Sequence, residues 1–234
     1  MTKASSVHGE LPTGAPVEGS DAGVPGRLPL VGRFVRVTPV EPSAHAPALF
    51  AATHGDPDVE AVWTYMPYGP FPSVDAMRDW LSELSPSTDP MFFTVLDLDS
   101  GGPIGVVSYL NIVPWDRRIE LGHIWYVPAA QRGRANTEVT YLLLRDAFDR
   151  LGDRRVEWKC DALNARSRAA AERLGFTFEG VFRQHMIVKG RNRDTAWFSM
   201  TDAEWPDRRE AMERWLDAEP GALSLRELTA ALRR

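Results

Sequence analysis

The sequence predicts one α+β domain with an additional segment at each end. Of its 234 residues, 44% are hydrophobic, which is enough for a substantial core. Alternating or β-branched runs typical of strands recur along the chain, and one amphipathic helical pattern over 137–151 interrupts them. We expect a leader over 1–26, the domain over 27–205 and a helical appendage over 206–234.

The first part of the chain combines a polar leader with strand and helix patterns. The leader is rich in Gly, Pro, Ser and Ala, so it buries too little surface to offset the entropy of ordering and should be flexible. A strand is expected at 33–38, where side chains alternate, and helices at 42–53 and 74–84. Between these helices, 62–71 is predicted to be an aromatic loop, because Pro and Gly punctuate it.

The middle of the chain predicts antiparallel strands. Residues 91–96 and 104–113 are β-branched or aromatic, and the Asp- and Gly-rich segment between them suits a hairpin turn. A further strand at 119–127 follows a turn at 114–117. These strands precede the amphipathic helix.

The helix over 137–151 is the clearest in the sequence. Glu138 lies in its first turn, where a carboxylate complements the positive end of the helix dipole. Its apolar residues recur at helical spacing: Val139, Leu142, Leu143, Ala147 and Phe148. The remaining expected elements are a strand at 155–160, a helix at 165–174, strands at 177–188 and 194–201, and one or two helices after residue 206.

Composition argues against several classes of protein. The single cysteine, Cys160, cannot form an intramolecular disulfide and should be a small buried side chain. No His or Cys spacing suggests a metal site, so no metal is expected. No apolar run approaches the roughly 20 residues that span a bilayer, and no signal peptide is evident, so a cytoplasmic protein without membrane partners is expected. The net charge of -5 argues against general nucleic-acid binding.

The basic charge is concentrated in residues 131–193, which contain 14 Lys and Arg against 8 Asp and Glu. This suits a phosphate-bearing ligand, although the same arginines could simply solvate helix faces. A turn over 128–136 lies between the expected strand at 119–127 and the helix at 137–151. Such a turn can hold a pyrophosphate, because unpaired amides and the helix dipole both face the anion.

Four motifs downstream occur in an informative order. They are Asn164-Ala-Arg-Ser167, Leu174-Gly-Phe176, Glu179-Gly-Val-Phe-Arg183 followed by Asp194, and Met200-Thr-Asp-Ala-Glu-Trp205. This order resembles the C-terminal half of the GNAT superfamily of acyl-CoA-dependent N-acyltransferases, in the branch related to the RimJ/RimL ribosomal-protein N-acetyltransferases. The resemblance covers about residues 30–205. It implies a mixed, mostly antiparallel sheet of about seven strands flanked by helices, with acetyl-CoA (coenzyme A) as cofactor.

The phosphate turn departs from the family pattern Gln/Arg-x-x-Gly-x-Gly/Ala. Gln131 matches it, but Arg134 replaces the first Gly and Asn136 replaces the final Gly or Ala. Gly133 could relieve the turn, while Arg132 and Arg134 could neutralise phosphate oxygens. The resemblance also implies a set of cofactor-binding residues: Trp125, Tyr126, Val127, Gln131, Arg132, Gly133, Arg134, Ala135, Asn136, Thr137, Asn164, Arg166 and Ser167.

The resemblance also implies roles in catalysis. Glu120 matches the Glu-x-Gly pattern of the branch and is the expected general base, acting through water. His123 would point to the opposite face of a regular strand and is a reserve base or a packed histidine. A bulge near Tyr126 or Val127 could direct an amide at the oxyanion. The Tyr that many members use as an acid is absent, so Ser167 or solvent would serve the thiolate.

The expected acceptor pocket is largely aromatic and would suit a hydrophobic or flat amine. Its residues are Trp63, Tyr65, Tyr68, Phe71, His123, Arg183 and His185. The aromatic residues could equally form a satellite core or a dimer contact, so a homodimer stays open. The leading hypothesis is an acetyl-CoA-dependent N-acetyltransferase acting on a small-molecule primary amine or a protein N-terminus. The alternative is a catalytically silent GNAT-like domain that senses acyl-CoA or binds a partner protein.

Overall fold

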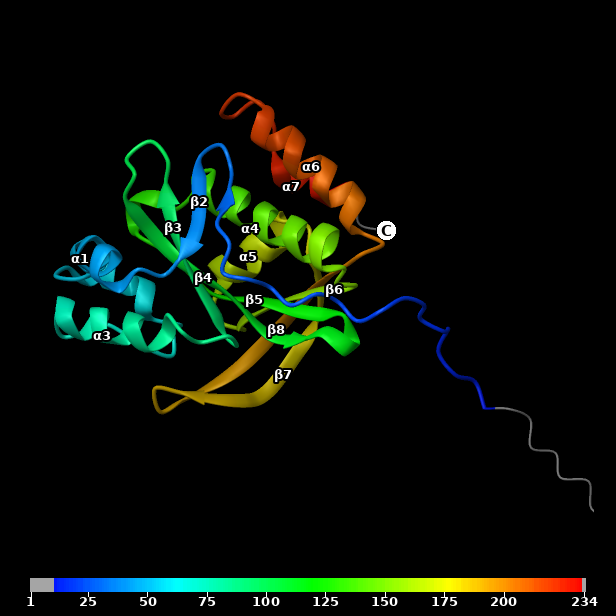
Figure 1. Cartoon of the computed structure of the whole chain (residues 1–234), viewed down its shortest axis with the longest axis horizontal. Helices are drawn as coiled ribbons and strands as arrows, with labels where there is room; N and C mark the ends of the chain where they lie inside the picture. Colours follow the sequence, from blue (N-terminus) through cyan, green and yellow to red (C-terminus); the bar gives the residue numbers. More distant parts are fainter. Residues whose placement is uncertain (1–10, 233–234) are drawn as a thin grey trace, which may run out of the picture.

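One eight-stranded sheet forms the centre of the protein (Figure 1). The computed structural model describes residues 11–232. Strands β5 and β6 pair in parallel, and all other neighbours in the order β1-β2-β3-β4-β5-β6-β8-β7 are antiparallel. The predicted mixed, mostly antiparallel sheet is confirmed. The strands are β1 Leu30–Val31, β2 Val35–Pro39, β3 Met91–Asp97, β4 Pro103–Val113, β5 Arg118–Tyr126, β6 Arg155–Asp161, β7 Thr177–Val188 and β8 Arg191–Thr201.

The sheet has one strand more than expected, because β1 at 30–31 precedes the strand predicted over 33–38, and residues 32–34 form the turn between β1 and β2. Gly32 donates its amide to the carbonyl of Val35 at 2.9 Å, which closes that turn between β1 and β2. The carboxylate of Glu138 accepts the amides of Arg33 and Phe34 at 2.7 Å and of Val35 at 2.8 Å. Glu138 therefore mainly caps this turn, rather than serving the dipole of its own helix as predicted.

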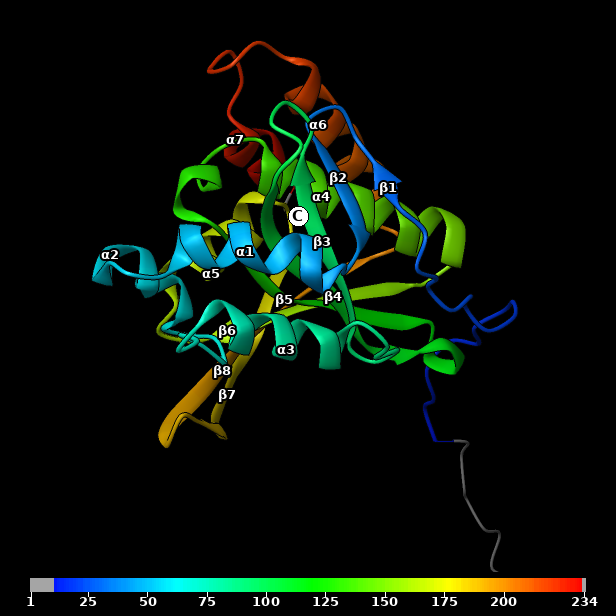
Figure 2. The ribbon, with the colours of Figure 1, turned by 60° about the vertical axis from the view of Figure 1, so that its left-hand side comes forward.

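Helices cover both faces of the sheet (Figure 2). Because strand side chains alternate, Phe92 and Val106 pack with α1 and α3, whereas Phe93 and Val107 pack with α4 and α5. No helix within residues 11–232 is long and apolar enough to cross a membrane. The α-helices are α1 Pro42–Thr53, α2 Pro57–Glu60, α3 Val74–Leu84, α4 Ala135–Arg145, α5 Ala165–Arg173, α6 Trp205–Asp217 and α7 Leu225–Ala230, with short helical turns η1 Ala61–Trp63, η2 Pro114–Asp116 and η3 Pro128–Ala130 and a π-helical segment η4 Asp146–Leu151.

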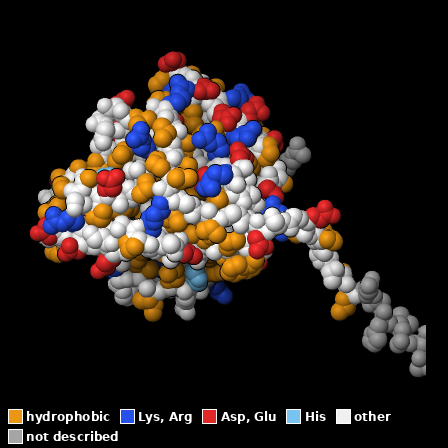
Figure 3. All heavy atoms as spheres, in the orientation of Figure 1, with side chains coloured by type: hydrophobic (Ala, Val, Ile, Leu, Met, Phe, Trp, Pro, Cys, Tyr) orange, Lys and Arg blue, Asp and Glu red, His pale blue; other side chains and the backbone are white. Residues whose placement is uncertain are grey.

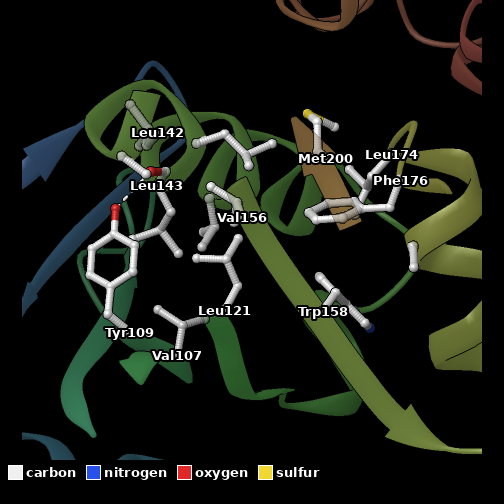
Figure 4. Close-up of a cluster of buried hydrophobic side chains, with 14 of the residues drawn as sticks. Val107, Tyr109, Leu121, Leu142, Leu143, Val156, Trp158, Leu174, Phe176 and Met200 are labelled. Carbon is white, nitrogen blue, oxygen red and sulfur yellow. Dashed lines mark hydrogen bonds between the residues drawn. The ribbon is translucent and has the colours of Figure 1, made fainter. Parts of the chain in front are cut away.

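The larger core lies between the sheet and α4 to α7. Tyr109 is buried in it and donates its hydroxyl to the carbonyl of Leu143 at 2.6 Å. Cys160 is buried in the same cluster, as predicted. Each large side chain buried here contributes about 1.5–3 kcal/mol. Figure 4 shows Val107, Tyr109, Leu121, Leu142, Leu143, Val156, Trp158, Leu174, Phe176 and Met200 converging from strands, helix α4 and the end of α5.

The segments at the two ends of the chain pack against the domain. Helices α6 and α7 confirm the helical prediction, and Met212 and Leu225 belong to the larger core. Residues 11–26 form no helix or strand, but Ala22 and Gly23 donate amides to carbonyls of the body at 3.0 and 2.7 Å. Residues 1–10 of the expected leader lie outside the described residues.

Candidate active site

Strands β5 and β6 diverge at the centre of the sheet. Their last pair is Leu121 with Trp158, after which the described β5 pairs only with β4, and β6 only with β8. The second half of β5 therefore has no strand partner on its β6 side. An extended ligand can enter such an opening and bond to the exposed main chain.

A β-bulge lies in β5 at this opening. Between the pairs Ser108–Gly122 and Val106–Trp125, one residue of β4 opposes two of β5. His123, within the bulge, adopts a left-handed backbone conformation with φ 51°. The bulge occurs earlier than the expected position near Tyr126 or Val127, because the extra residue is inserted directly after Gly122.

The bulge brings His123 to the same face of the sheet as Glu120. The imidazole lies 5.6 Å from the Tyr68 ring and 4.8 Å from the Phe92 ring, both between centroids, on the side of α1 and α3. Glu120 faces that side too, because its neighbours Ile119 and Leu121 belong to the opposite core. The prediction that His123 points away from Glu120 is wrong, since it assumed a regular strand.

Glu120 is a buried carboxylate with two side-chain partners. It accepts hydrogen bonds from Lys159 Nζ at 2.9 Å and Asn111 Nδ2 at 2.7 Å, and only 1% of its surface is exposed. Burial raises the pKa of Glu120, and Lys159 and Asn111 partly oppose this. A carboxylate with a raised pKa is a stronger base, so this environment favours proton acceptance by Glu120.

His123 is held in its neutral form. Burial lowers its pKa to about 4, and the positive charges of Lys159 and Arg193 add to the effect. Sequence analysis missed both cations. Lys159 could have been found from strand geometry, because it lies two residues beyond Glu157, the parallel partner of Glu120, and therefore faces the same side.

The backbone amides of Tyr126 and Val127, which were expected to serve the oxyanion, differ in their availability to a ligand. Val127 donates its amide to the carbonyl of Ile104 at 2.9 Å, so the prediction that it serves an oxyanion is wrong. Because Val127 bonds to Ile104, the paired residues Gly105 and Tyr126 do not hydrogen-bond to each other. The Tyr126 amide therefore points away from β4 and toward the opening. The Tyr126 carbonyl accepts from Gln131 Nε2 at 3.0 Å.

The turn before α4 contains the predicted phosphate-binding residues. Arg132, rather than Gly133, adopts the left-handed conformation, with φ 63°. A cavity of about 280 Å³ lies beside it and is lined by Gln131, Arg132 and Arg166 together with Pro128 and residues of α2 and η1. The structure therefore brings these three predicted side chains together between the turn and the start of α5.

Arg134 is engaged elsewhere. Its guanidinium donates to the carbonyl of Leu216 at 2.9 Å and to that of Ala218, at the end of α6, and lies 4.9 Å from the centre of the Phe34 ring. The expected direct neutralisation of phosphate by this side chain has no support in that geometry. The family's Gly is replaced here by a residue that fastens α6 to the start of α4.

The rest of the turn is also bonded within the protein. Buried Thr137 accepts a hydrogen bond from Arg173 Nη1 at 2.9 Å, and Ala135 packs against the larger core. Asn136 Oδ1 is buried and has no hydrogen-bond partner among the described residues. The groups at this turn that are not bonded within the protein are thus mainly main-chain amides and the Arg132 side chain.

Asn164 and Ser167 meet at the start of α5. Asn164 Oδ1 accepts the Ser167 amide at 3.0 Å, which caps the helix. Ser167 Oγ accepts from Trp158 Nε1 at 3.1 Å, next to the last pair of β5 and β6. A hydrogen bond from Ser167 also moderates the rise that burial causes in the pKa of the Cys160 thiol. The hydroxyl therefore lies beside the opening, on the α5 side.

The predicted acceptor residues divide into several groups. A second core lies between the sheet and helices α1 and α3. Trp63, 1% exposed, belongs to this second core, and Phe71 and Tyr68 pack against it. Tyr68 also stacks on His123 at the site. Tyr65 is exposed and donates its hydroxyl to the carbonyl of Leu163 at 3.2 Å. Trp125 packs in this second core as well.

The two β7 residues expected in the pocket are exposed. His185 Nδ1 lies 3.0 Å from Thr195 Oγ1, and Arg183 makes no ion pair with Asp194 among the described residues. Asp194 instead accepts the amide of Gln184 at 2.7 Å, which holds its pKa below the usual range. Strand β7 forms one edge of the sheet, and the β7–β8 hairpin extends beyond the body in both ribbon views (Figures 1 and 2).

Comparison with known proteins agrees with this architecture. Residues 35–177 match the family model described as "Acetyltransferase (GNAT) domain". A GCN5-related N-acetyltransferase from Brucella melitensis is 40% identical, with a TM-score of 0.85 over 91% of this chain and 98% of that one. A probable acetyltransferase of the GNAT family from Chromobacterium violaceum is also 40% identical, with a TM-score of 0.76 over 84% and 98%.

A curated relative covers a shorter part of the chain. The "Putative ribosomal N-acetyltransferase YdaF" of Bacillus subtilis (strain 168) is 31% identical over 108 residues. That match spans 46% of this chain and 58% of the relative's own length. The family match extends over more than half of this chain, and the fold and the opening between β5 and β6 agree with it. The chain therefore belongs to the GNAT family of acetyltransferases.

Proposed function

We propose that the protein is an acetyl-CoA-dependent N-acetyltransferase that transfers the acetyl group to a primary amine by direct attack on the thioester. The observation that carries the proposal is the buried Glu120 at the point where β5 and β6 separate. Strand divergence provides a path for an extended ligand, and the carboxylate with a raised pKa provides a base at its end.

The residues around the opening fit coenzyme A. Its phosphates would meet the main-chain amides before α4 together with Arg132 and Arg166, which line one cavity. Its extended arm would follow the unpaired side of β5 between Gly122 and Tyr126, near Ser167. When bound, acetyl-CoA supplies an acetyl group activated as a thioester.

Different groups at the site accept the proton and stabilise the negative charges that the reaction produces. Glu120 accepts the ammonium proton through water, while Lys159 and Asn111 hold the carboxylate in position. The Tyr126 amide donates a hydrogen bond to the developing oxyanion. Ser167 donates a hydrogen bond to the thiolate, which takes its proton from solvent. His123, neutral at pH 7, orients the acceptor against Tyr68.

The acceptor is a small-molecule amine or a protein N-terminus. Aromatic side chains at the site favour an apolar or flat body, and the name of the curated relative refers to a ribosomal substrate. We place the protein in the cytoplasm and expect no nucleic-acid or membrane partner. A homodimer through the exposed edge strand β7 would be compatible with acetyl transfer at every site.

Calorimetric titration with acetyl-CoA tests the necessary first step. One saturable site per chain is expected, followed by thiol release on addition of a panel of primary amines. Binding without release for any amine would favour an acyl-CoA sensor. Absence of binding over a range of temperatures would favour a silent interaction domain and remove the proposed role of Glu120.

A further inference from the structure

We infer that the acceptor is a small primary amine that carries an anionic group, and that Arg193 binds this group. The inference rests on the proposed function and narrows it, because it separates small anionic amines from protein N-termini. It is based on an unpaired guanidinium, on the charge around Glu120 and on two contacts that close the site.

Arg193, which lies on β8, has a side chain without a counter-ion among the described residues. Its Nε atom is buried and has no hydrogen-bond partner, and its guanidinium makes no ion pair with any described residue. By contrast, Arg155 on the adjacent strand pairs with Glu157 at 2.8 Å and Glu179 at 2.6 Å. A partly buried cation without a counter-ion is unfavourable, so an anion from a ligand would be bound strongly here.

The position of Arg193 links it to the catalytic face. Ala196 and Phe198 face the larger core, and the extra residues of the β7–β8 bulge next to Arg193 lie on β7. Alternation along β8 therefore puts Arg193 and Trp197 on the other side with Glu120. Lys159 lies between Trp197 and Glu120: its Nζ atom is 5.2 Å from the centre of the Trp197 ring and 2.9 Å from Glu120. The Arg193 charge is also close enough to His123 to lower the pKa of that imidazole.

Arg193 is a cation on this face that has no counter-ion among the described residues. Glu120 is paired with Lys159, His123 is neutral, and no carboxylate forms an ion pair with Arg193 among the described residues. Arg193 therefore offers a positive charge without a counter-ion on the same face as the buried Glu120–Lys159 pair. Elsewhere the two signs are mixed: acidic and basic side chains are interspersed on the face in Figure 3. Local excess of one sign steers and selects ligands of the other.

Two contacts bridge the opening and limit the size of the acceptor. Tyr65 belongs to the aromatic loop that packs on β5, and its hydroxyl reaches the carbonyl of Leu163, which follows β6. Lys189, at the end of the β7–β8 hairpin, donates to the carbonyls of Trp63 at 2.9 Å and Gly69 at 2.6 Å in the same loop. These bridges would obstruct a polypeptide more than a small molecule.

Matched amines test the inference with the full-length protein. Thiol release would be compared for L-phenylalanine and its amide, for 2-aminoethylphosphonate and ethylamine, and for a neutral tetrapeptide with a free N-terminus. In at least one pair, kcat/KM should be about tenfold or more higher for the anionic amine. Arg193→Gln should abolish that preference by lowering kcat/KM for the anionic amine to about the value for its neutral partner, and Arg193→Lys should retain part of the preference.

Arg191→Gln is the matched control, because Arg191 is an exposed arginine on the same strand. It should keep the preference, and thermal unfolding should show that all three variants fold. Equal kcat/KM values within every pair, a preference that survives Arg193→Gln, or a tetrapeptide that reacts faster than the small amines would overturn the inference.

A binding measurement separates failure of the inference from failure of the proposed function. If acetyl-CoA binds but no amine releases thiol, the proposed function fails. Calorimetry with N-acetyl-L-phenylalanine and its amide then decides the inference without turnover. Tighter binding of the acid by about tenfold, lost in Arg193→Gln, supports the anion site, and equal binding of the two ligands rejects it.

Discussion

The phosphate turn and the acceptor site lie on either side of the same opening but use their side chains differently. At the turn, Gln131, Arg134 and Thr137 are bonded within the protein, so a ligand meets mainly main-chain groups. At the acceptor site, the buried Nε of Arg193 has no partner among the described residues. We therefore expect cofactor binding to tolerate sequence change at this turn, and acceptor choice to depend on individual side chains.

The largest expected effect is on the acceptor side, at the proposed base. Glu120→Gln should lower kcat by about 10²–10⁴-fold, because a positioned general base contributes that much. The dissociation constant of acetyl-CoA should change little, since Glu120 lies near the start of β5 and the phosphate turn follows the end of that strand. Thiol release and calorimetry measure the two quantities.

Glu157→Gln is the control for charge removal at this position. Glu157 lies beside Glu120 on β6 and is paired with Arg155 and Arg118 rather than Lys159. It should keep kcat within a few-fold. A similar fall in both variants would show that the loss comes from disturbing the strands and not from removing a base.

The next effect concerns Glu138, which lies on helix α4 directly after the phosphate turn and caps the turn between β1 and β2. Glu138→Ala removes the acceptor for three backbone amides and should lower the free energy of unfolding by about 2–4 kcal/mol. Because those bonds support the β1–β2 turn, the variant should still bind acetyl-CoA below its unfolding temperature. Denaturant unfolding and calorimetry test this, and a stable variant that cannot bind would place Glu138 in the ligand site instead.

His123, at the acceptor site, should also make the free energy of unfolding depend on pH. The pKa of His123 is about 4 when folded against 6.5 in its ordinary state, so below pH 6.5 the unfolded chain binds a proton that the native one does not. Wild-type stability should therefore fall between pH 6.5 and 4 by about 3 kcal/mol through this group. His123→Gln should lack that contribution, as urea unfolding at several pH values would show.

Comparing wild type with His123→Gln is necessary because Asp153 has the opposite effect. Burial raises the Asp153 pKa to about 7, so its contribution to stability falls as pH rises from about 4 to 7. This contribution is common to both proteins and cancels in the difference. Parallel stability curves for the two proteins would mean that the imidazole titrates normally when folded.

The sequence was sufficient for the sheet because alternation and helical periodicity are local. The strands from β3 to β8 and the helix α4 follow such patterns, and the motif order from Asn164 to Trp205 led to the family. Strand β1 was missed and the start of β2 was placed two residues too early, since only the tertiary bonds of Glu138 show where the turn between them lies.

The site was harder to predict because one inserted residue changes the face of a strand. Without the bulge at His123, alternation separates it from Glu120, and sequence carries no signal for that insertion. Arg193 was missed for another reason: its significance depends on the absence of a counter-ion among the described residues around it. Arg134 was assigned to phosphate because its contacts with α6 join residues more than 80 positions apart.

The smallest effects concern the phosphate turn and separate its two arginines. Arg134→Ala should lower the free energy of unfolding by about 1–2 kcal/mol through lost bonds to α6, and change acetyl-CoA affinity less than threefold. Arg132→Ala should leave stability unchanged but weaken binding by about three- to tenfold, because Arg132 lines the cavity. Calorimetry and thermal unfolding of both variants distinguish these outcomes. Tenfold weaker binding in Arg134→Ala, with stability intact, would mean that its side chain leaves α6 to contact the cofactor.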